Sequence, residues 1–448
     1  MKILLFNPWI IDVKAFDFWL KPIGLLTLGR WLKESGHEVR LMDCLDRHHP
    51  IIRNSGRIVP EDRSNGTGKF ISEPIQKPFS IQSIPRTLKR YGMPVSMGKK
   101  ILNEWKDHDW IPDQIFVTSM MTYWYLGAWE AISVLKETFP SRPVVLGGVY
   151  PSLMPNHARN SGADLICPHT RPKEVWTFLN EHRFDLRSPI SWMIPDYSFY
   201  NQPLSHLVYI TSLGCPFRCT YCATPKLQSP MFEDPDRLTQ CMIADLDRTG
   251  AQNIALFDDA ILMNHTDHLD LLLENIIQSR IPDRGVRFHL PNGLHARLLT
   301  QRTASLMKQA RFQTIRIGVE TLNERYLLAS GGKLNRQDFE NAVHTLFQAG
   351  FSRKEISAYV MINLPGQTNE DVKTTIQKCK DLGIGVNVNE YSPIPGTPDY
   401  QSEIFVESTD PLLMNNALLP YWWDKGMSVQ EIQKLKNELN RDRRDGFI

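Results

Sequence analysis

Between residues 206 and 391 the sequence alternates six times between a short apolar run and an amphipathic segment. The apolar runs are typical of buried strands, and the amphipathic segments have the period of helices. Six such units predict a partial (β/α)6 TIM-like barrel over residues 200–400, with functional side chains at the carboxyl ends of its parallel strands. We expect strands at 206–212, 253–258, 286–290, 314–319, 355–362 and 386–391, and helices at 235–249, 265–280, 300–310, 323–330, 336–349 and 369–382.

Residues 1–190 show a similar alternation, which predicts a separate α/β domain. We expect strands at 2–6, 38–43, 114–118, 143–146 and 163–167, and helices at 24–35 and 125–138. This pattern is typical of a doubly wound, Rossmann-like parallel sheet, in which ligands bind at the carboxyl ends of the strands. The loops at Asn7-Pro8, Ser119-Met120-Met121-Thr122 and Gly147-Gly148 should therefore face one crevice.

The composition limits the partners that this chain of 448 residues can have. With 42% hydrophobic residues it has ample core for two or three domains, so a disordered chain is excluded. The net charge of +2 predicts no general attraction to nucleic acid or to a membrane. No apolar window approaches 18 residues and the first residues lack a cleavable signal pattern, so we expect a cytoplasmic protein.

Two segments depart from the alternation. A basic insertion lies at about residues 51–105, where positions 51–100 carry ten Lys or Arg against three Asp or Glu. This excess could bind an anionic substrate such as a phosphate ester, or it could be a solvated excursion. Residues 401–448 are expected to form a helical extension, with a helix at 428–444 that Ser428 and Glu431 cap.

Three of the seven cysteines stand in a C-x3-C-x2-C run, at Cys215, Cys219 and Cys222. Three thiolates on one loop can bind three irons of a cubane [4Fe-4S] cluster and leave the fourth iron open. The alternative is structural zinc, which needs a fourth ligand such as His206 or a distant cysteine. That alternative would make the chain a non-catalytic zinc-binding or regulatory protein.

The cysteine run, with Tyr221 as its aromatic residue, resembles the C-x3-C-x-aromatic-C signature of the radical S-adenosylmethionine (SAM) superfamily. The resemblance implies that the amine and carboxylate of SAM bind the open iron, and that one-electron reduction releases a 5′-deoxyadenosyl radical. In the superfamily, side chains on the second to fifth strands contact SAM, although each could also be a helix cap or a turn residue. The residues that this likeness assigns to SAM are Asp258, Asp259, Asn292, Arg316 and Glu320.

An α/β domain that precedes such a barrel is similar to the cobalamin-binding class of radical SAM enzymes. The likeness implies that Asn7, Ser119, Thr122, Gly147 and Gly148 surround a corrin cofactor. No Asp-x-His-x-x-Gly motif is present, and residues 167–174 replace the usual Gly-Glu-(Gly/Ala)-Glu. The first domain could therefore bind cobalamin, or it could be an inherited scaffold that now binds the substrate.

The resulting hypothesis is an oxygen-sensitive radical SAM enzyme that methylates an unactivated carbon of a small molecule. If no cobalamin is bound, a rearrangement, cyclisation or oxidation becomes the expected reaction. A methylthiotransferase would need an auxiliary cluster, for which the four scattered cysteines offer no pattern. Electrons would come from a flavodoxin or ferredoxin, and nucleic acid is an improbable partner.

Overall fold

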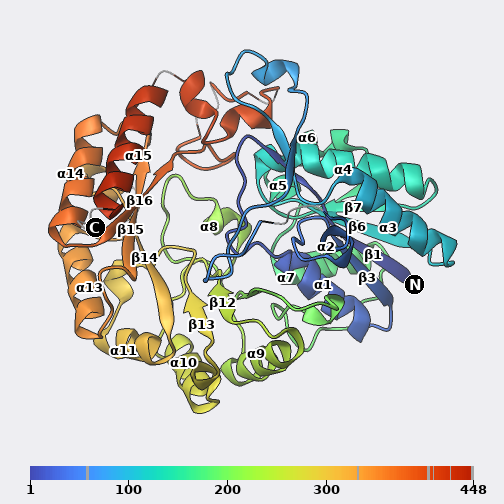
Figure 1. Cartoon of the computed structure of the whole chain (residues 1–448), viewed down its shortest axis with the longest axis horizontal. Coiled ribbons are helices and arrows are strands. Elements are labelled where there is room, and N and C mark those ends of the chain that lie inside the picture. The colour runs from blue at the N-terminus through green and yellow to red at the C-terminus, as the bar shows by residue number, and fades with distance from the viewer. Residues whose placement is uncertain (57–59, 330–331, 401–403, 407, 424, 445–448) are drawn as a thin grey trace. The chain divides into compact units, whose positions relative to one another are not determined.

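The computed structural model describes residues 1–56, 60–329, 332–400, 404–406, 408–423 and 425–444 (Figure 1). The chain divides into two compact units, which are described separately. The first unit is Met1–Tyr209 with Ala244–Ala251 and Val406–Leu413, and the second is Ile210–Ile243 with Gln252–Phe405 and Met414–Ile448.

A five-stranded parallel sheet forms the centre of the first unit, counted over the described residues. Its order β3-β1-β6-β7-β8 is the 2-1-3-4-5 order of a doubly wound fold, whose topological switch point lies between β1 and β6. This confirms the predicted Rossmann-like sheet. The strands are β1 (Lys2–Asn7), β3 (Glu38–Asp43), β6 (Gln114–Thr118), β7 (Val144–Gly147) and β8 (Leu165–Ile166).

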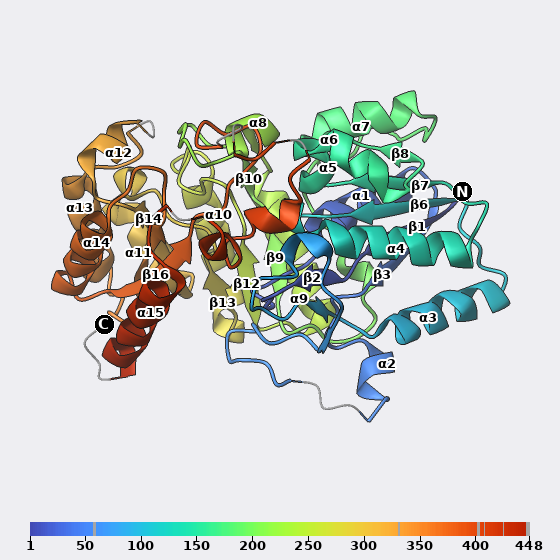
Figure 2. The same ribbon diagram turned by 90° about the horizontal axis from the view of Figure 1, so that it is seen from above.

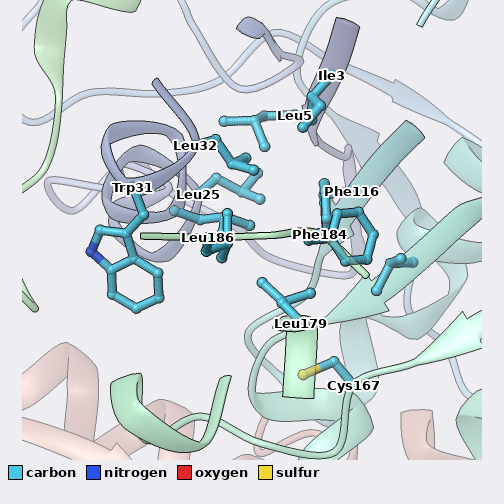
Figure 3. Close-up of a cluster of buried hydrophobic side chains, with 12 residues drawn as sticks. Ile3, Leu5, Leu25, Trp31, Leu32, Phe116, Cys167, Leu179, Phe184 and Leu186 are labelled. Carbon is cyan, nitrogen blue, oxygen red and sulfur yellow. The ribbon is translucent and has the colours of Figure 1, made fainter. Parts of the chain in front are cut away.

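Helices cover the sheet of the first unit. Strand β1 is apolar along its length, and Ile3, Leu4, Leu5 and Phe6 are all completely buried because a parallel sheet of this type is covered on both faces. Figure 3 shows Ile3 and Leu5 of β1 near Leu32 of α1, within a larger cluster that buries Cys167. The helices are α1 (Ile23–Glu34), α2 (Pro50–Arg53), α3 (Val95–Asp107), α4 (Tyr125–Thr138), α5 (Val149–Leu153), α6 (Pro155–Ala158) and α7 (Pro172–Glu181).

The basic insertion is partly ordered by its own charges. Strands β4 (Ser72–Pro74) and β5 (Lys89–Tyr91) pair antiparallel and extend onto β2 (Ile10–Asp12). Arg90 on β5 forms ion pairs with Glu73 and Glu130, and the buried Arg47 lies 2.8 Å from Asp17. Arg90 and Lys99 of the insertion therefore pair with acidic side chains of the same unit.

A second parallel sheet contains six strands in the described chain, in the order β16-β15-β14-β13-β12-β9. Because neighbouring strands follow one another in sequence, each intervening helix covers the outside of the sheet, and the arrangement curves as a partial barrel (Figures 1 and 2). This confirms the second half of the predicted fold. The strands are β9 (Leu207–Tyr209), β12 (Asn253–Leu256), β13 (Arg287–His289), β14 (Phe312–Glu320), β15 (Ile356–Ile362) and β16 (Gly385–Glu390).

The first barrel strand is shorter than the sequence predicts. The expected strand 206–212 ends at Tyr209, and Ser212–Leu213 forms a separate strand β10 that pairs antiparallel with β11 (Met231–Phe232). The backbone N–H groups of Thr211 and Ser212 donate to the Asp258 carboxylate, so the ladder cannot use them.

The barrel helices lie close to their predicted positions, and α13 and α14 each begin with a capping box. Helix α10 begins at Leu269 and not at the expected His265, because the preceding residues form turns. In the described chain no helix combines the length and apolar character needed to cross a membrane. The helices are α8 (Thr224–Leu227), α9 (Pro235–Thr249), α10 (Leu269–Gln278), α11 (Gln301–Gln309), α12 (Glu324–Ala329), α13 (Arg336–Gln348), α14 (Asn369–Asp381) and α15 (Val429–Arg444).

Candidate functional site

The three clustered cysteines lie on one loop between β10 and α8. Cys219 is buried, and Cys215 and Cys222 are half-buried. Burial, with a smaller contribution from the negative charge of neighbouring thiolates, raises the pKa of Cys215 to about 11. The thiols are therefore close enough to influence one another, and a metal that binds them must displace their protons.

The surroundings of this loop favour thiolate ligands. Burial raises the pKa of Cys219, whereas the nearby positive charge of Lys333 and a hydrogen bond from Tyr221 lower it. Among the described residues, no three His, Cys, Asp or Glu side chains converge as ligands of one metal ion. In a cubane cluster each thiolate binds a different iron, so three cysteines on one loop are a donor set that can hold such a cluster. His206, the fourth ligand of the zinc alternative, contacts the Gly66 carbonyl at 3.2 Å instead.

Asp259 holds both ends of the cysteine loop. One carboxylate oxygen accepts the backbone N–H of Gly214 at 2.9 Å, and the other accepts the hydroxyl of Thr224 at 3.2 Å. Gly214 directly precedes Cys215 and Thr224 closely follows Cys222. A single half-buried carboxylate therefore sets the span of the loop.

Asp258 anchors the segment that leads into the loop. Its Oδ1 accepts the backbone N–H and the hydroxyl of both Thr211 and Ser212. Its Oδ2 is buried and has no hydrogen-bond partner within the described structure. Burial raises the pKa of Asp258 to about 6, against the lowering effect of these hydrogen bonds. Asn292 donates to the carbonyl of Asp258 at 2.9 Å, so it supports the same turn.

Glu320 ends strand β14 in an unusual backbone conformation, with φ at +63° beside a shift in the register of β14 and β15. Its carboxylate lies 3.4 Å from the ammonium of Lys333, and both side chains are largely buried. A Cβ at Gly318 would lie 2.7 Å from the Lys333 Nζ, and a Cβ at Gly293 would lie 2.7 Å from the Gly318 Cα. Two glycines therefore permit the close approach of the strands and of Lys333.

Arg316 lies on β14 of the same sheet. Its guanidinium donates to the Tyr359 hydroxyl at 2.7 Å, and that hydroxyl donates to the Pro291 carbonyl at 2.6 Å. Burial raises the pKa of Tyr359, and the charge of Arg316 lowers it. The chain of contacts links β14 and β15 to the loop after β13.

Three side chains near the cysteine loop escaped the sequence prediction. Asp399 accepts the hydroxyls of Thr220, at 2.8 Å, and Tyr326, at 2.6 Å. His295 lies 3.7 Å from the Cys215 Sγ, and burial with the charge of Lys333 lowers its pKa to about 3. Asp399 and His295 follow predicted strands, and this position could have marked them as site residues. Lys333 has no local sequence pattern that marks it.

The residues proposed for a corrin share one edge of the first unit's sheet. The registers of β1, β6 and β7 place Asn7, Ser119 and Gly147 at neighbouring carboxyl ends. The Asn7 amide donates to Asp43 at 2.7 Å, and a Cβ at Gly148 would lie 2.5 Å from the Ser119 carbonyl oxygen. The backbone there is closely packed, at the edge of the sheet where ligands of doubly wound folds bind.

The loop after β6 also exposes two apolar side chains. Met120 and Met121 are 43% and 38% exposed, whereas Ser119 and Thr122 on either side are buried. Large apolar side chains exposed at a ligand-binding edge mark a surface that can receive an apolar partner.

The family model described as the radical SAM superfamily matches residues 209–396. These residues form a radical SAM domain. The match spans the cysteine loop and the barrel strands, and it confirms the class predicted from the cysteine run. At the level of the family, the radical SAM domain identifies an enzyme class that uses a [4Fe-4S] cluster and SAM.

Individual relatives of the radical SAM domain are distant. An uncharacterized methyltransferase of Pyrococcus horikoshii is 25% identical over 51% of this chain and 47% of that protein. A tRNA-2-methylthio-N(6)-dimethylallyladenosine synthase of Bordetella avium is 26% identical over 45% of this chain and 44% of that protein. The matches thus cover about half the length of these curated relatives.

Solved structures of radical SAM proteins share the fold over most of the chain. One is the methyltransferase TsrM of Kitasatospora setae, which is described with cobalamin and a [4Fe-4S] cluster bound. It matches with a TM-score of 0.61 and 16% sequence identity, and the match covers 89% of this chain and 73% of that chain. Another is OxsB, which is described as a cobalamin-dependent SAM radical enzyme with aqua-cobalamin and SAM bound. It matches with a TM-score of 0.54 and 15% sequence identity, and the match covers 93% of this chain and 55% of that chain. At such identities these matches establish the fold alone, in which an N-terminal α/β domain precedes the barrel.

Proposed function

We propose that the protein is a cobalamin-dependent radical SAM enzyme that methylates an unactivated carbon of a small molecule. The observation that carries this proposal is the combination of two features in one chain. The radical SAM barrel presents three cysteines on one loop, and the first unit has a 2-1-3-4-5 sheet with an exposed apolar loop at its switch point. TsrM and OxsB, which are described with cobalamin, have this combination of folds.

Cys215, Cys219 and Cys222 are the proposed ligands of the cluster. When bound, a [4Fe-4S] cluster with SAM supplies the electron that cleaves SAM to a 5′-deoxyadenosyl radical. The surrounding protein would keep the loop in shape, since Asp259 spans its ends and Asp399 holds Thr220 in its middle. Tyr221 would contribute its hydrogen bond to Cys219.

The paired charges at the end of β14 are the proposed contacts of SAM. SAM carries a carboxylate, an ammonium and ribose hydroxyls, which need a cation and an acceptor in the same site. Lys333 and Glu320 provide these two groups 3.4 Å apart, and burial raises the pKa of Glu320 while Lys333 lowers it. Asp258, Asp259, Asn292 and Arg316 stay proposed as site residues, and their observed contacts support a role in positioning the loops.

The exposed loop after β6 is the proposed platform for cobalamin. When bound, cobalamin would supply a transferable methyl group. The corrin ring is flat and largely apolar, so it fits the exposed side chains of Met120 and Met121. Asn7, Ser119, Thr122, Gly147 and Gly148 form the backbone edge beside this loop, and they stay proposed as its contacts.

Substrate, electron donor and location are proposals of the same kind. We propose a small-molecule substrate that carries an anionic group, because part of the insertion is basic. Nucleic acid is not the proposed substrate. A flavodoxin or ferredoxin is the proposed electron donor. A cytoplasmic location would keep the thiols reduced for the cluster.

The test is a metal analysis of the protein after anaerobic reconstitution with iron, sulfide and hydroxocobalamin, followed by desalting. Retention of about four irons and one cobalt per chain is the expected result. Iron without cobalt would contradict cobalamin dependence and would favour a rearrangement, cyclisation or oxidation. One zinc without iron would contradict the radical SAM enzyme as a whole.

A pair of matched variants locates the cobalamin site. Met120→Glu places a charge on the proposed platform and should abolish cobalt retention without loss of iron. Ile190→Glu is the control, because Ile190 is 69% exposed in the same unit. Its backbone N–H contacts Glu34 at the end of α1, which leads to the opposite edge of the sheet. Equal cobalt retention by both variants would exclude the β6 loop as the platform.

A further inference from the structure

His295 occupies a fixed position beside the first cysteine of the loop. Its Nε2 lies 3.7 Å from the Cys215 Sγ, within hydrogen-bond reach for sulfur. Its ring stacks on Phe217, with centroids 5.0 Å apart and an interplanar angle of 17°. Phe217 belongs to the cysteine loop itself, so the imidazole is held against the loop by both its edge and its face.

The backbone of His295 is also restrained. Leu294, its neighbour, forms an isolated parallel bridge with Ile317 of β14. The Leu294 N–H donates to the Arg316 carbonyl at 2.6 Å, and its carbonyl accepts the Gly318 N–H at 3.0 Å. His295 is 5% exposed, so neither solvent nor backbone motion readily displaces the ring.

The chemistry of a cluster ligand determines the direction of this hydrogen bond. A neutral imidazole has one N–H donor and one bare nitrogen acceptor. A free Cys215 thiol can donate its proton to Nε2, but a cysteine bound to iron is a thiolate and has no proton to donate. The contact can then persist only if Nε2 carries the hydrogen and donates to the sulfur.

We propose that His295 donates an Nε2–H hydrogen bond to the Cys215 thiolate of the cluster and thereby raises the reduction potential of that cluster. This inference rests on the proposed function, since it requires an iron–sulfur cluster on the three cysteines. Reduction adds negative charge to the cluster and its sulfurs, and a hydrogen bond to a sulfur stabilises that charge. His295 is thus a positioning and tuning residue that acts through Cys215.

The orientation of the ring accounts for a second observation. The Nδ1 atom of His295 is buried and has no hydrogen-bond partner in the described part of the chain. With the hydrogen on Nε2, Nδ1 is an acceptor directed away from the sulfur. An unsatisfied buried acceptor is unfavourable, so this nitrogen would also accept a donor from a bound ligand.

The test compares two substitutions at this position by redox titration of the reconstituted cluster in the absence of SAM. His295→Phe keeps a flat ring against Phe217 but has no donor, whereas His295→Gln keeps an N–H donor of similar reach. We expect His295→Phe to lower the equilibrium constant for cluster reduction threefold to tenfold, about 30–60 mV for a one-electron couple. We expect His295→Gln to stay close to the unmodified protein.

An unchanged potential in His295→Phe with full iron content would overturn the proposal. An equal shift in both variants would also overturn it, because the effect would then come from packing. Absence of iron from the unmodified protein would refute the proposed function itself, which separates the two failures.

A second measurement uses the unmodified protein and does not depend on the stability of a variant. Protein labelled with ¹⁵N only in histidine is reconstituted, reduced and studied by pulsed electron paramagnetic resonance. A hydrogen bond from Nε2 to a cluster sulfur should produce a weak ¹⁵N hyperfine coupling. A spectrum without that coupling would overturn the proposal.

Discussion

Replacement of Gly214 by alanine should disturb the cysteine loop at its first residue. Gly214 has φ at +84°, and a Cβ there would lie 2.8 Å from the Pro230 nitrogen and 2.9 Å from the Ser229 carbonyl carbon. A left-handed conformation costs an L-residue about 1–2 kcal/mol. The contact with rigid backbone adds an overpacking cost of about 1–3 kcal/mol. We therefore expect the free energy of unfolding to fall by about 2–5 kcal/mol.

Gly366 provides a matched control in the same unit. Its φ is +80°, close to that of Gly214, but a Cβ there would meet no atom within 4 Å. Gly366→Ala should therefore carry the conformational cost of about 1–2 kcal/mol alone. The difference between the two variants isolates the contact with residues 229 and 230.

Urea denaturation of the metal-free protein, followed by circular dichroism, measures the stability of both variants. Iron content after anaerobic reconstitution then measures the effect on the site. Gly366→Ala should bind as much iron as the unmodified protein, whereas Gly214→Ala should bind clearly less, because Cys215 and the hydrogen bond from Gly214 to Asp259 both shift. Equal stability and equal iron content in the two variants would refute the reasoning.

Three further predictions follow from the buried charges. Asp258 has a pKa of about 6 against an ordinary 3.8, so the folded state binds its proton more tightly, and this contribution to stability is lost as pH rises from 4 to 6. Asp258→Asn cannot titrate, so its unfolding free energy relative to the unmodified protein should rise by about 2 kcal/mol between pH 4 and pH 7, and a constant difference would contradict this. Asp399→Ala should speed the loss of iron to a chelator because Thr220 and Tyr326 lose their acceptor. Tyr326→Phe removes only one of these bonds and should have a smaller effect, and equal rates in all three proteins would argue against this reasoning. Lys333→Met should weaken SAM binding to the reconstituted protein about tenfold to a hundredfold in equilibrium dialysis, because one charge-assisted hydrogen bond is lost. Lys308 pairs with Glu355, so Lys308→Met should leave SAM binding unchanged.

Local pattern was sufficient for much of this fold. The helix 235–249 and the strand 114–118 have their predicted bounds, since apolar periodicity and end signals lie within each segment. The cysteine run is equally local, because its three sulfurs come from eight consecutive residues. The strand predicted at 206–212 was wrong at its end, since a carboxylate 46 residues away takes the N–H of Ser212.

The sequence by itself determined the two α/β folds, the run of three cysteines and the acidic residues that follow the second barrel strand. Only the tertiary structure showed that Asp258 and Asp259 direct their hydrogen bonds at the cysteine loop. It alone brought Lys333 to Glu320, Asp399 to Thr220 and His295 to Cys215, pairs that are 13, 179 and 80 positions apart. Periodicity reports which residues share a face of one helix or strand. The curvature of the barrel decides which loops meet, and that depends on how all the strands pack together.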